Sequence, residues 1–261
     1  MKIVLVGAGR VATQLGRALF EAGHDIVAVY SYHLSSAEQL TALVGGTATD
    51  NIGLLPDEAD LFVVSVKDGV LEAVVAQLCE GRRGQTMVHT AGSMPMALFE
   101  GKAEHYGVLY PLQTFSKERR VDFSMTPIFI EASDASVQTL LHQVTSSISR
   151  QVSVLSTADR KYLHLAAVFA CNFANHCYAM AATLLERHGV PFNVMLPLID
   201  ETARKVHELH PRDAQTGPAV RYDENVIGMQ AQLLADLPDL QRLYLLLSES
   251  IHSTRTDNHH L

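Results

Sequence analysis

The chain opens with a short apolar run, Lys2–Val6, that leads directly into a glycine turn. The turn reads Gly7-x-Gly9-x-x-Ala12 and is followed by apolar residues at helical spacing and then by a second apolar run, Ile26–Tyr30. A strand, a glycine turn, a helix and a parallel strand within about 30 residues form a dinucleotide-binding unit. This feature therefore predicts that the chain begins with a β-α-β unit that binds a nucleotide cofactor.

Each residue type in the turn has a physical role in such a unit. Gly7 permits the tight turn, Gly9 lets the backbone approach a pyrophosphate, and the small Ala12 permits close packing of the helix on the strand. Arg10 and Val11 stand in the first helical turn, whose N–H groups face the phosphate charge. The alternative is a glycine-rich turn in another kind of α/β protein.

The pattern of the first half extends this unit into a sheet. Short apolar runs recur, separated by helical or turn-like segments, at residues 61–66, 86–89, 107–110, 127–131 and 152–155. This alternation is typical of a mainly parallel, doubly wound sheet covered by helices. We therefore expect an α/β Rossmann domain over residues 1–155.

The pattern of the second half is different. Helical periodicity covers Asp159–His188, Asn193–Leu209 and Asn225–His252, with no strand between them. Ser156 or Thr157 is expected to cap the first of these helices. The second half, residues 156–261, is therefore predicted to be an all-α C-terminal domain.

Composition narrows the class of protein. The net charge of −8, without runs of Lys or Arg, argues against nucleic acid or an anionic membrane as a partner. No continuous apolar stretch approaches the length of a membrane span, and the N-terminus begins a strand and not a signal peptide, so we expect a cytoplasmic protein. Cys79, Cys171 and Cys177 lack metal-type spacing, and His259 and His260 belong to a polar tail. No metal site is predicted.

The end of the second strand indicates which nucleotide binds. NAD-binding proteins place a carboxylate there to bind the ribose, but Asp25 lies at the opposite end of this strand. Ser31, Ser35 and His33 could instead bind a 2′-phosphate, with added charge from Arg10. The sequence therefore favours NADP over NAD. Capping of the next helix is an alternative role for both serines.

Two further strand ends are expected to border the cofactor. Ser65, Val66 and Lys67 lie where the apolar run at residues 61–66 ends, and His89 ends the next run. Ligands bind at the carboxyl ends of parallel strands, which places these residues at the nucleotide. His89 either faces the nicotinamide or substrate or forms hydrogen bonds within the strand-loop junction.

Polar residues on the long helix are the catalytic candidates. Lys161, His164, Val168, Asn172 and Asn175 fall on one face of a regular α-helix. Reduction of a C=O or C=N bond needs a proton donor, for which Lys161 or His164 is suited, and Asn172 could orient the substrate. The alternatives are hydrogen bonds between packed helices and, for Lys161, a surface position in the first turn.

One segment of the second half could bind an anionic substrate. Residues 216–225 combine a Gly-Pro turn with a cation and two carboxylates. Arg221 could bind a substrate carboxylate, or it could pair with Asp223 or Glu224.

Together these segments resemble a family of bacterial Rossmann-like NADP oxidoreductases, of the deazaflavin-dependent type, with a C-terminal helical domain of unknown function. The matching segments are Gly7-x-Gly9-x-x-Ala12, His89–Gly92, Tyr110–Phe115, Lys161–Phe173 and Thr216–Asp223. The organisation is also similar to that of pyrroline-carboxylate reductase, ketopantoate reductase and the β-hydroxyacid dehydrogenases. In those relatives the helical domain covers the nicotinamide, commonly builds a dimer, and supplies a Lys and an Asn that act on the substrate.

The resemblance implies an NADP-dependent oxidoreductase that transfers hydride between NADP(H) and a small carbonyl, imine or hydroxyacid substrate, working as a homodimer through the helical domain. The separation of Lys161 and Asn172, eleven residues, is wider than in the β-hydroxyacid dehydrogenases. The alternative function is a nucleotide-responsive regulatory protein that does not catalyse a reaction.

Overall fold

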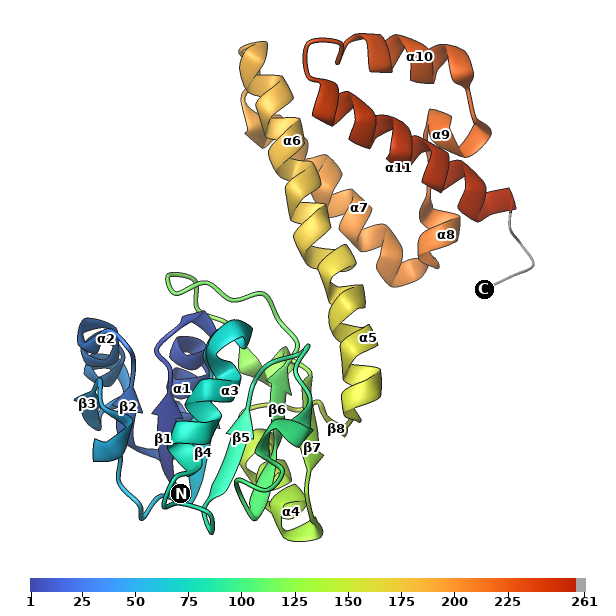
Figure 1. Ribbon diagram of the computed structural model, residues 1–261. Helices are drawn as coiled ribbons and strands as arrows, with labels where there is room; N and C mark the ends of the chain where they lie inside the picture. Colours follow the sequence, from blue (N-terminus) through green and yellow to red (C-terminus); the bar gives the residue numbers. More distant parts are fainter. Residues whose placement is uncertain (257–261) are drawn as a thin grey trace. The chain divides into compact units, whose positions relative to one another are not determined.

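The computed structural model describes residues 1–256, with side chains as far as Thr254, and the tail that includes His259 and His260 lies outside this range (Figure 1). The described chain forms two compact units. The first is Met1–Asn172, and the second begins at Phe173. The boundary between the two units lies inside a helix that follows the last strand. The predicted boundary between functional domains, at residue 155, stays a prediction.

The first unit is built on one eight-stranded sheet with the order β3-β2-β1-β4-β5-β6-β7-β8. The strands are β1 (Lys2–Val6), β2 (Asp25–Tyr30), β3 (Thr47–Thr49), β4 (Leu61–Val64), β5 (Thr86–His89), β6 (His105–Pro111), β7 (Ile128–Ala132) and β8 (Val152–Val154). All neighbouring strands are parallel except β6 and β7, which are antiparallel. The predicted Rossmann-like sheet is therefore confirmed.

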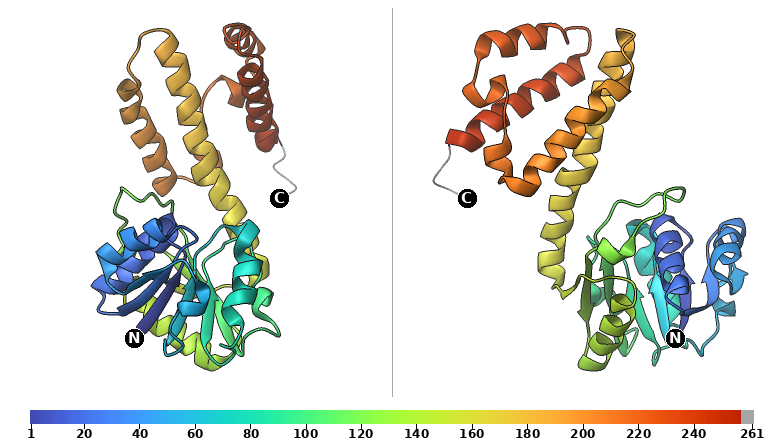
Figure 2. Two further views of the ribbon diagram at one scale, coloured as in Figure 1. Left: turned by 60° about the vertical axis from the view of Figure 1, so that its left-hand side comes forward. Right: turned by 180° about the vertical axis from the view of Figure 1, so that it is seen from behind.

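Helices cover both faces of this sheet (Figures 1 and 2). One face packs against α1 (Arg10–Glu21), α2 (Leu34–Val44) and α4 (Ala135–Ser146), and the other against α3 (Asp68–Cys79) and the 3-10 helices η1 (Ile52–Leu54) and η2 (Met96–Phe99). In β1, Ile3 and Leu5 point to the first face, whereas Val4 and Val6 point to the second. A central parallel strand is apolar on both sides because helices bury both faces.

The expected strands are present, and the structure adds one that the sequence did not indicate. The additional strand, β3, is short and rich in threonine, and it follows the Gly45-Gly46 pair. It pairs with β2 at the edge of the sheet. A further 3-10 helix, η3 (Phe123–Met125), precedes β7.

The long helix is present but not regular. It runs as α5 (Thr157–Ala167), a π-helical segment η4 (Val168–Phe173) and α6 (Ala174–Arg187). The Ser156 side chain accepts a hydrogen bond from the Asp159 N–H, which confirms the expected cap. A π-helix bonds i to i+5 and so adds a residue to its turn. Residues beyond η4 therefore do not continue the face that a regular helix would give them.

The second unit is helical throughout its described part. Its elements after α6 are η5 (Phe192–Met195), α7 (Leu196–Glu208), α8 (Pro211–Ala214), α9 (Pro218–Arg221), α10 (Glu224–Gln232) and α11 (Pro238–Thr256). The expectation of one helix over Asn225–His252 is wrong, because the chain breaks between α10 and α11. Pro238 starts α11, and proline, which has no N–H, suits the first turn of a helix and not its interior.

Few side chains of the second unit are buried within the single chain. From residue 173 to residue 254 the buried ones are Ala219, Ile227, Ala231, Leu234 and Ser248. Among the described helices, Thr157–Arg187 is long and apolar enough to cross a membrane, by length and composition alone, although it has no continuous apolar stretch of that length. None of its most apolar 18-residue window is buried.

Candidate functional site

The glycine turn between β1 and α1 has the geometry that a nucleotide requires. Gly7 has a φ of +118°, and a Cβ at this position would lie 2.3 Å from the carbonyl oxygen of Ser65. Only glycine is compatible with this turn. At Gly9 an added Cβ would meet no atom within 4 Å, so the backbone here faces open space.

The N-terminus of α1 is open as well. Gly9 is its N-cap and supplies no side-chain hydrogen bond, and the first turn contains no acidic residue. The first helical bond runs from the Thr13 N–H to the Gly9 carbonyl oxygen, at 2.9 Å. The N–H groups of Arg10, Val11 and Ala12 precede it, and such groups have no partner within a helix. These residues fit a pyrophosphate, which would accept from the free N–H groups.

Close packing of α1 on the sheet depends on two small residues. Ala12 is fully buried, as expected. Gly16, one turn later, lies against β1 so closely that a Cβ added to it would lie 2.7 Å from Cδ1 of Leu5. Sequence reasoning missed Gly16, although its helical spacing from Ala12 is the signal that could have found it.

The end of β2 carries hydroxyl groups and no carboxylate. The Ser31 N–H donates to the carbonyl oxygen of Thr49 at 3.0 Å. The N-cap of α2 is His33, whose side chain makes no capping bond, so neither Ser31 nor Ser35 caps this helix. An uncapped helix N-terminus and two available serines therefore adjoin the strand end where a ribose phosphate binds in this fold.

The loops that follow β4 and β5 are bonded to each other. The Thr90 hydroxyl donates to Oγ of Ser65 at 3.0 Å, and the Ser93 hydroxyl donates to the Asp68 carboxylate. Val66 packs against the glycine turn, and the exposed Lys67 is the N-cap of α3. Ser65 and Val66 therefore lie beside the glycine turn, at the carboxyl ends of the strands.

His89 is buried within the strand-loop junction. Its Nδ1 accepts from the Ala91 N–H at 3.2 Å, and its Nε2 lies 3.3 Å from the Pro95 carbonyl oxygen, to which it donates. The ring also stacks on Phe99. Burial and the nearby Arg160 charge lower the pKa of His89 to about 4. His89 is therefore neutral and holds the loop in place, which favours the second of the two roles considered above.

A pocket of about 640 Å³ adjoins the glycine turn. It is lined by Arg10 and Val11, by Tyr110, by the loop Leu112–Phe115 and by side chains of the helix between residues 163 and 172. All of these belong to the first unit. The pocket therefore joins the predicted cofactor turn to the predicted catalytic helix.

Two of the three catalytic candidates line this pocket. His164 and Asn172 do, together with Val168, whereas Lys161 is exposed and is not among the lining residues. Asn172 lies in η4, so the widened π turn forms part of the pocket wall. Asn175 follows η4 and does not line the pocket. The roles assigned to these residues stay predictions.

Tyr110 is a polar lining residue to which sequence reasoning gave no role. Its hydroxyl lies 3.0 Å from Nδ1 of His164. Burial raises the pKa of Tyr110, and the nearby Arg160 charge opposes this rise. A Cβ on Gly92 would lie 2.6 Å from the same Nδ1 and 2.9 Å from Cε2 of Tyr110, so the absence of a side chain at Gly92 makes room for both rings. The signal in the sequence was a tyrosine at the end of an otherwise apolar strand.

A buried ion pair fixes the start of α5. Arg160 is 1% exposed, pairs with Glu131 of β7, and donates from Nη2 to the Met94 carbonyl oxygen at 2.7 Å. Glu131 also accepts from the N–H and hydroxyl of Thr157, at 2.8 and 2.7 Å. Burial raises the pKa of Glu131, but the bonds from Arg160 and Thr157 outweigh this and the net shift is downward. The helix that carries His164 is therefore anchored to the sheet and to the loop after β5.

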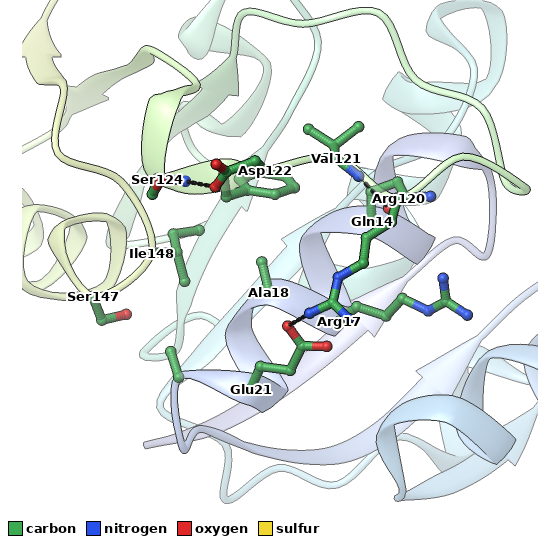
Figure 3. A pocket seen from close by; sticks show the side chains of 12 residues that line it. Gln14, Arg17, Ala18, Glu21, Arg120, Val121, Asp122, Ser124, Ser147 and Ile148 are labelled. Carbon is green, nitrogen blue, oxygen red and sulfur yellow. Dashed lines mark hydrogen bonds and ion pairs between the residues drawn. The ribbon is translucent and has the colours of Figure 1, made fainter.

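Gln14 fastens the loop after β6 to α1 (Figure 3). Its buried amide donates to the carbonyl oxygens of Ser116, Lys117 and Arg119 at 2.8, 3.3 and 3.0 Å, and its oxygen accepts from the Val121 N–H at 3.3 Å. A second hollow of about 590 Å³ lies beside this contact, against the last turns of α1. The beginning of the same loop lines the first pocket.

Arg221 has no carboxylate partner among the described residues. Asp223 caps α10 by accepting from the Val226 N–H at 3.3 Å, and neither it nor Glu224 pairs with Arg221. Tyr222, which lies between Arg221 and Asp223, has a φ of +50°, which is uncommon for a residue other than glycine. The ion-pair alternative for Arg221 is thus absent from the structure.

The described residues contain no group of three His, Cys, Asp or Glu side chains that could hold a metal ion. Cys79, Cys171 and Cys177 are all free thiols.

Comparison with known proteins identifies both halves of the chain. Residues 1–112 match the Rossmann-like domain family, and residues 126–251 match a domain of unknown function, DUF2520. None of the curated proteins compared with the chain matches it.

Solved structures resemble the chain over nearly its whole length. A Bacteroides fragilis protein named "putative NADP oxidoreductase" is 53% identical, with a TM-score of 0.93 over 97% of this chain and 98% of its own. Two more distant structures share the fold. An imine reductase from Myxococcus stipitatus in complex with NADP+ is 14% identical, with a TM-score of 0.67 over 98% and 94% of the two chains. Pyrroline carboxylate reductase from Plasmodium falciparum with NADP bound is 11% identical, with a TM-score of 0.61 over 97% and 99%. The chain therefore belongs to the family of Rossmann-like oxidoreductases whose second domain is DUF2520.

Proposed function

We propose that this oxidoreductase binds NADP(H) at the glycine turn and transfers hydride between it and a small carbonyl, imine or hydroxyacid substrate. One observation supports this most strongly. Arg10 and Val11, whose N–H groups are free for a pyrophosphate, also line the pocket that contains His164 and Asn172. A nucleotide held at this turn has a cavity beside it in which a small substrate can react.

The residues of the pocket supply what the reaction needs besides hydride, which the bound nucleotide provides. His164 is the proton donor in this proposal, and the Asn172 amide orients the substrate. Lys161, outside the pocket lining, is the less suited donor. Replacement of Lys161 by Ala tests the remaining possibility, because loss of turnover with unchanged NADPH affinity would restore Lys161 to the mechanism.

The preference for NADP over NAD rests on the end of β2. No carboxylate stands there to bind a 2′-hydroxyl or to repel a 2′-phosphate, whereas Ser31, Ser35 and the uncapped start of α2 are hydrogen-bond donors. Arg10 adds a positive charge nearby in the fold. The name of the 53% identical Bacteroides fragilis protein, which calls it an NADP oxidoreductase, supports this preference.

We further propose that the protein is a soluble, cytoplasmic homodimer formed through its helical part. None of the apolar stretch within Thr157–Arg187 is buried in the single chain, and Leu196 and Leu198 of α7 and Leu245–Leu247 of α11 are exposed. Large exposed apolar surfaces mark interfaces, and obligate homodimer interfaces resemble a domain core cut in half. A second copy would bury these side chains.

The test of the nucleotide site is a fluorescence titration of the purified protein with NADPH and with NADH. We expect tighter binding of NADPH, and loss of binding in Gly9→Asp, whose carboxylate would occupy the space open to the pyrophosphate. Gly84→Asp is the control, because a Cβ at Gly84 also meets nothing within 4 Å but lies in the turn before β5, away from the glycine turn. Failure of the wild type to bind either nucleotide would overturn the proposal.

A further inference from the structure

The hydrogen bond between Tyr110 and His164 goes beyond what the proposed function uses. The two side chains come from β6 and α5, and both line the pocket. Their polar atoms lie 3.0 Å apart. A tyrosine that only filled space would not need its hydroxyl on the imidazole of His164.

The contact defines which ring nitrogen faces the substrate. Nδ1 is occupied by Tyr110 and lies against Gly92. Nε2 of His164 has no hydrogen-bonding partner among the described residues. It is also not one of the buried polar atoms without a partner, so it is accessible to solvent. When the Tyr110 hydroxyl donates to Nδ1, the neutral ring carries its proton on Nε2, the accessible nitrogen.

The charged and titratable groups around this pair come from four elements. Arg160 lies one helical turn before His164 on α5, and its partner Glu131 belongs to β7. His89 of β5 is neutral, and Arg10 of the glycine turn lines the same pocket. Burial raises the pKa of Tyr110, and the Arg160 charge acts in the opposite direction, toward the deprotonated form.

On the basis of the proposed function, we propose that Tyr110 is the source of the proton and that His164 relays it. As hydride reaches the substrate carbon, the π electrons of the C=O or C=N bond move to its oxygen or nitrogen. This atom takes the proton of His164 Nε2, and Nδ1 takes the proton of the Tyr110 hydroxyl. The ring ends neutral, with its proton on Nδ1. Tyr110 ends as a tyrosinate beside the Arg160 charge. A proton from solvent then returns to Nε2 while Nδ1 gives its proton back to the tyrosinate, which restores the starting state.

This relay differs from donation by a charged imidazolium in its dependence on pH. An imidazolium donor is lost as pH rises through the ordinary titration range of histidine, near a pKa of about 6.5. The relay uses the neutral ring and needs only the protonated tyrosine, whose pKa is ordinarily about 10. Activity that persists above pH 7.5 in the wild type and not in Tyr110→Phe is therefore its signature.

The first arm of the test needs no substrate. Spectra of 15N-histidine-labelled protein at pH 8 report which nitrogen of His164 carries the proton, assigned by comparison with His164→Gln. We expect the Nε2–H form in the wild type and a mixture of both forms in Tyr110→Phe. Tyr106→Phe is the control, because it removes a hydroxyl from the same strand without touching His164. An Nδ1–H ring in the wild type, or no change in Tyr110→Phe, would overturn the relay.

The second arm measures turnover with NADPH and a substrate that the wild type reduces. Tyr110→Phe should lower kcat at pH 8 by about 100-fold, within the usual range for a general acid, and should keep the NADPH dissociation constant. Its activity should depend more steeply on pH than that of the wild type, because the relay through the neutral ring is lost. A pH profile equal to that of the wild type would contradict the relay while leaving the oxidoreductase proposal intact, whereas absence of NADPH binding would remove both.

Discussion

Ser31 stands at the end of β2, where a ribose-binding carboxylate stands in NAD-binding Rossmann proteins. Ser31→Asp should therefore reverse the nucleotide preference. The new charge would repel a 2′-phosphate and accept from the ribose hydroxyls of NADH. We expect the NADPH dissociation constant to rise at least tenfold, or about 1.4 kcal/mol, and that of NADH to fall.

The measurement is the same fluorescence titration, with Ser153→Asp as the control. Ser153 is exposed on β8, at the far edge of the sheet from β3, so its substitution adds the same charge away from the nucleotide. Unchanged NADPH affinity in Ser31→Asp would show that the 2′-phosphate does not lie at this strand end.

Gly92 gives a second prediction at the residue scale. The methyl group of Gly92→Ala would lie 2.6 Å from Nδ1 of His164, which is too close for either to stay in place. We expect the variant to lose the Nε2–H preference of His164 and to be less stable by about 1–3 kcal/mol, as in overpacked cores. Urea unfolding and the 15N spectra check this, with Gly84→Ala as the control. An unaltered His164 signal would mean that the contact relaxes without moving the ring.

At the scale of the element, the Glu131–Arg160 pair holds the start of α5. Removal of one partner of a buried ion pair leaves the other charge uncompensated and costs about 3–5 kcal/mol. Because Glu131 is 17% exposed, we expect Glu131→Gln to lower the free energy of unfolding at pH 7 by the lower end of this range. Glu38→Gln, an exposed change on α2, is the control.

The loss of unfolding free energy in Glu131→Gln should depend on pH. The pKa of Glu131 is lower in the folded state than its ordinary value of 4.5, so its contribution is complete above pH 4.5 and disappears as pH falls through the folded pKa. The difference between wild type and Glu131→Gln should therefore shrink below pH 4.5. Urea unfolding at pH 7 and in the acid range measures it, and a difference that grows toward acid pH would contradict the assigned charge state.

Other elements show where the sequence was sufficient and where it was not. The fold and the glycine turn could be predicted from local patterns. Buried parallel strands appear in the sequence as apolar runs, and the turn requires a positive φ, which Gly7 supplies. The break before Pro238 was missed because helical periodicity continues on both sides of it. The π turn at Val168–Phe173 was missed because no residue type marks one.

The candidate site was predictable only in part for a related reason. His164 was found because its spacing placed it on a helical face, whereas Tyr110 belongs to a strand whose pattern gives no hint of its partner. Their contact spans 54 positions of the chain and depends on the space left by Gly92. Contacts of this kind are set by the packing of the whole sheet and helix, which local periodicity does not contain.

At the scale of the whole molecule, the exposed leucines of the helical part predict assembly. Leu198 of α7 is 58% exposed, and we expect Leu198→Glu to dissociate the proposed homodimer. Leu54→Glu is the matched control, because Leu54 is 73% exposed on η1 of the first unit. Light scattering after size-exclusion chromatography should give twice the chain mass of 28.6 kDa for wild type and control, and lower mass for Leu198→Glu. A monomeric wild type, or one that partitions into lipid vesicles, would contradict the homodimer.

A crystal structure of the protein with NADP+ would locate the nucleotide and its reactive ring in one experiment. We expect the pyrophosphate on the N–H groups after Gly9, the 2′-phosphate beside Ser31, and the nicotinamide ring in the pocket with His164 and Asn172. A nicotinamide outside this pocket, or a nucleotide bound away from the glycine turn, would contradict this expectation.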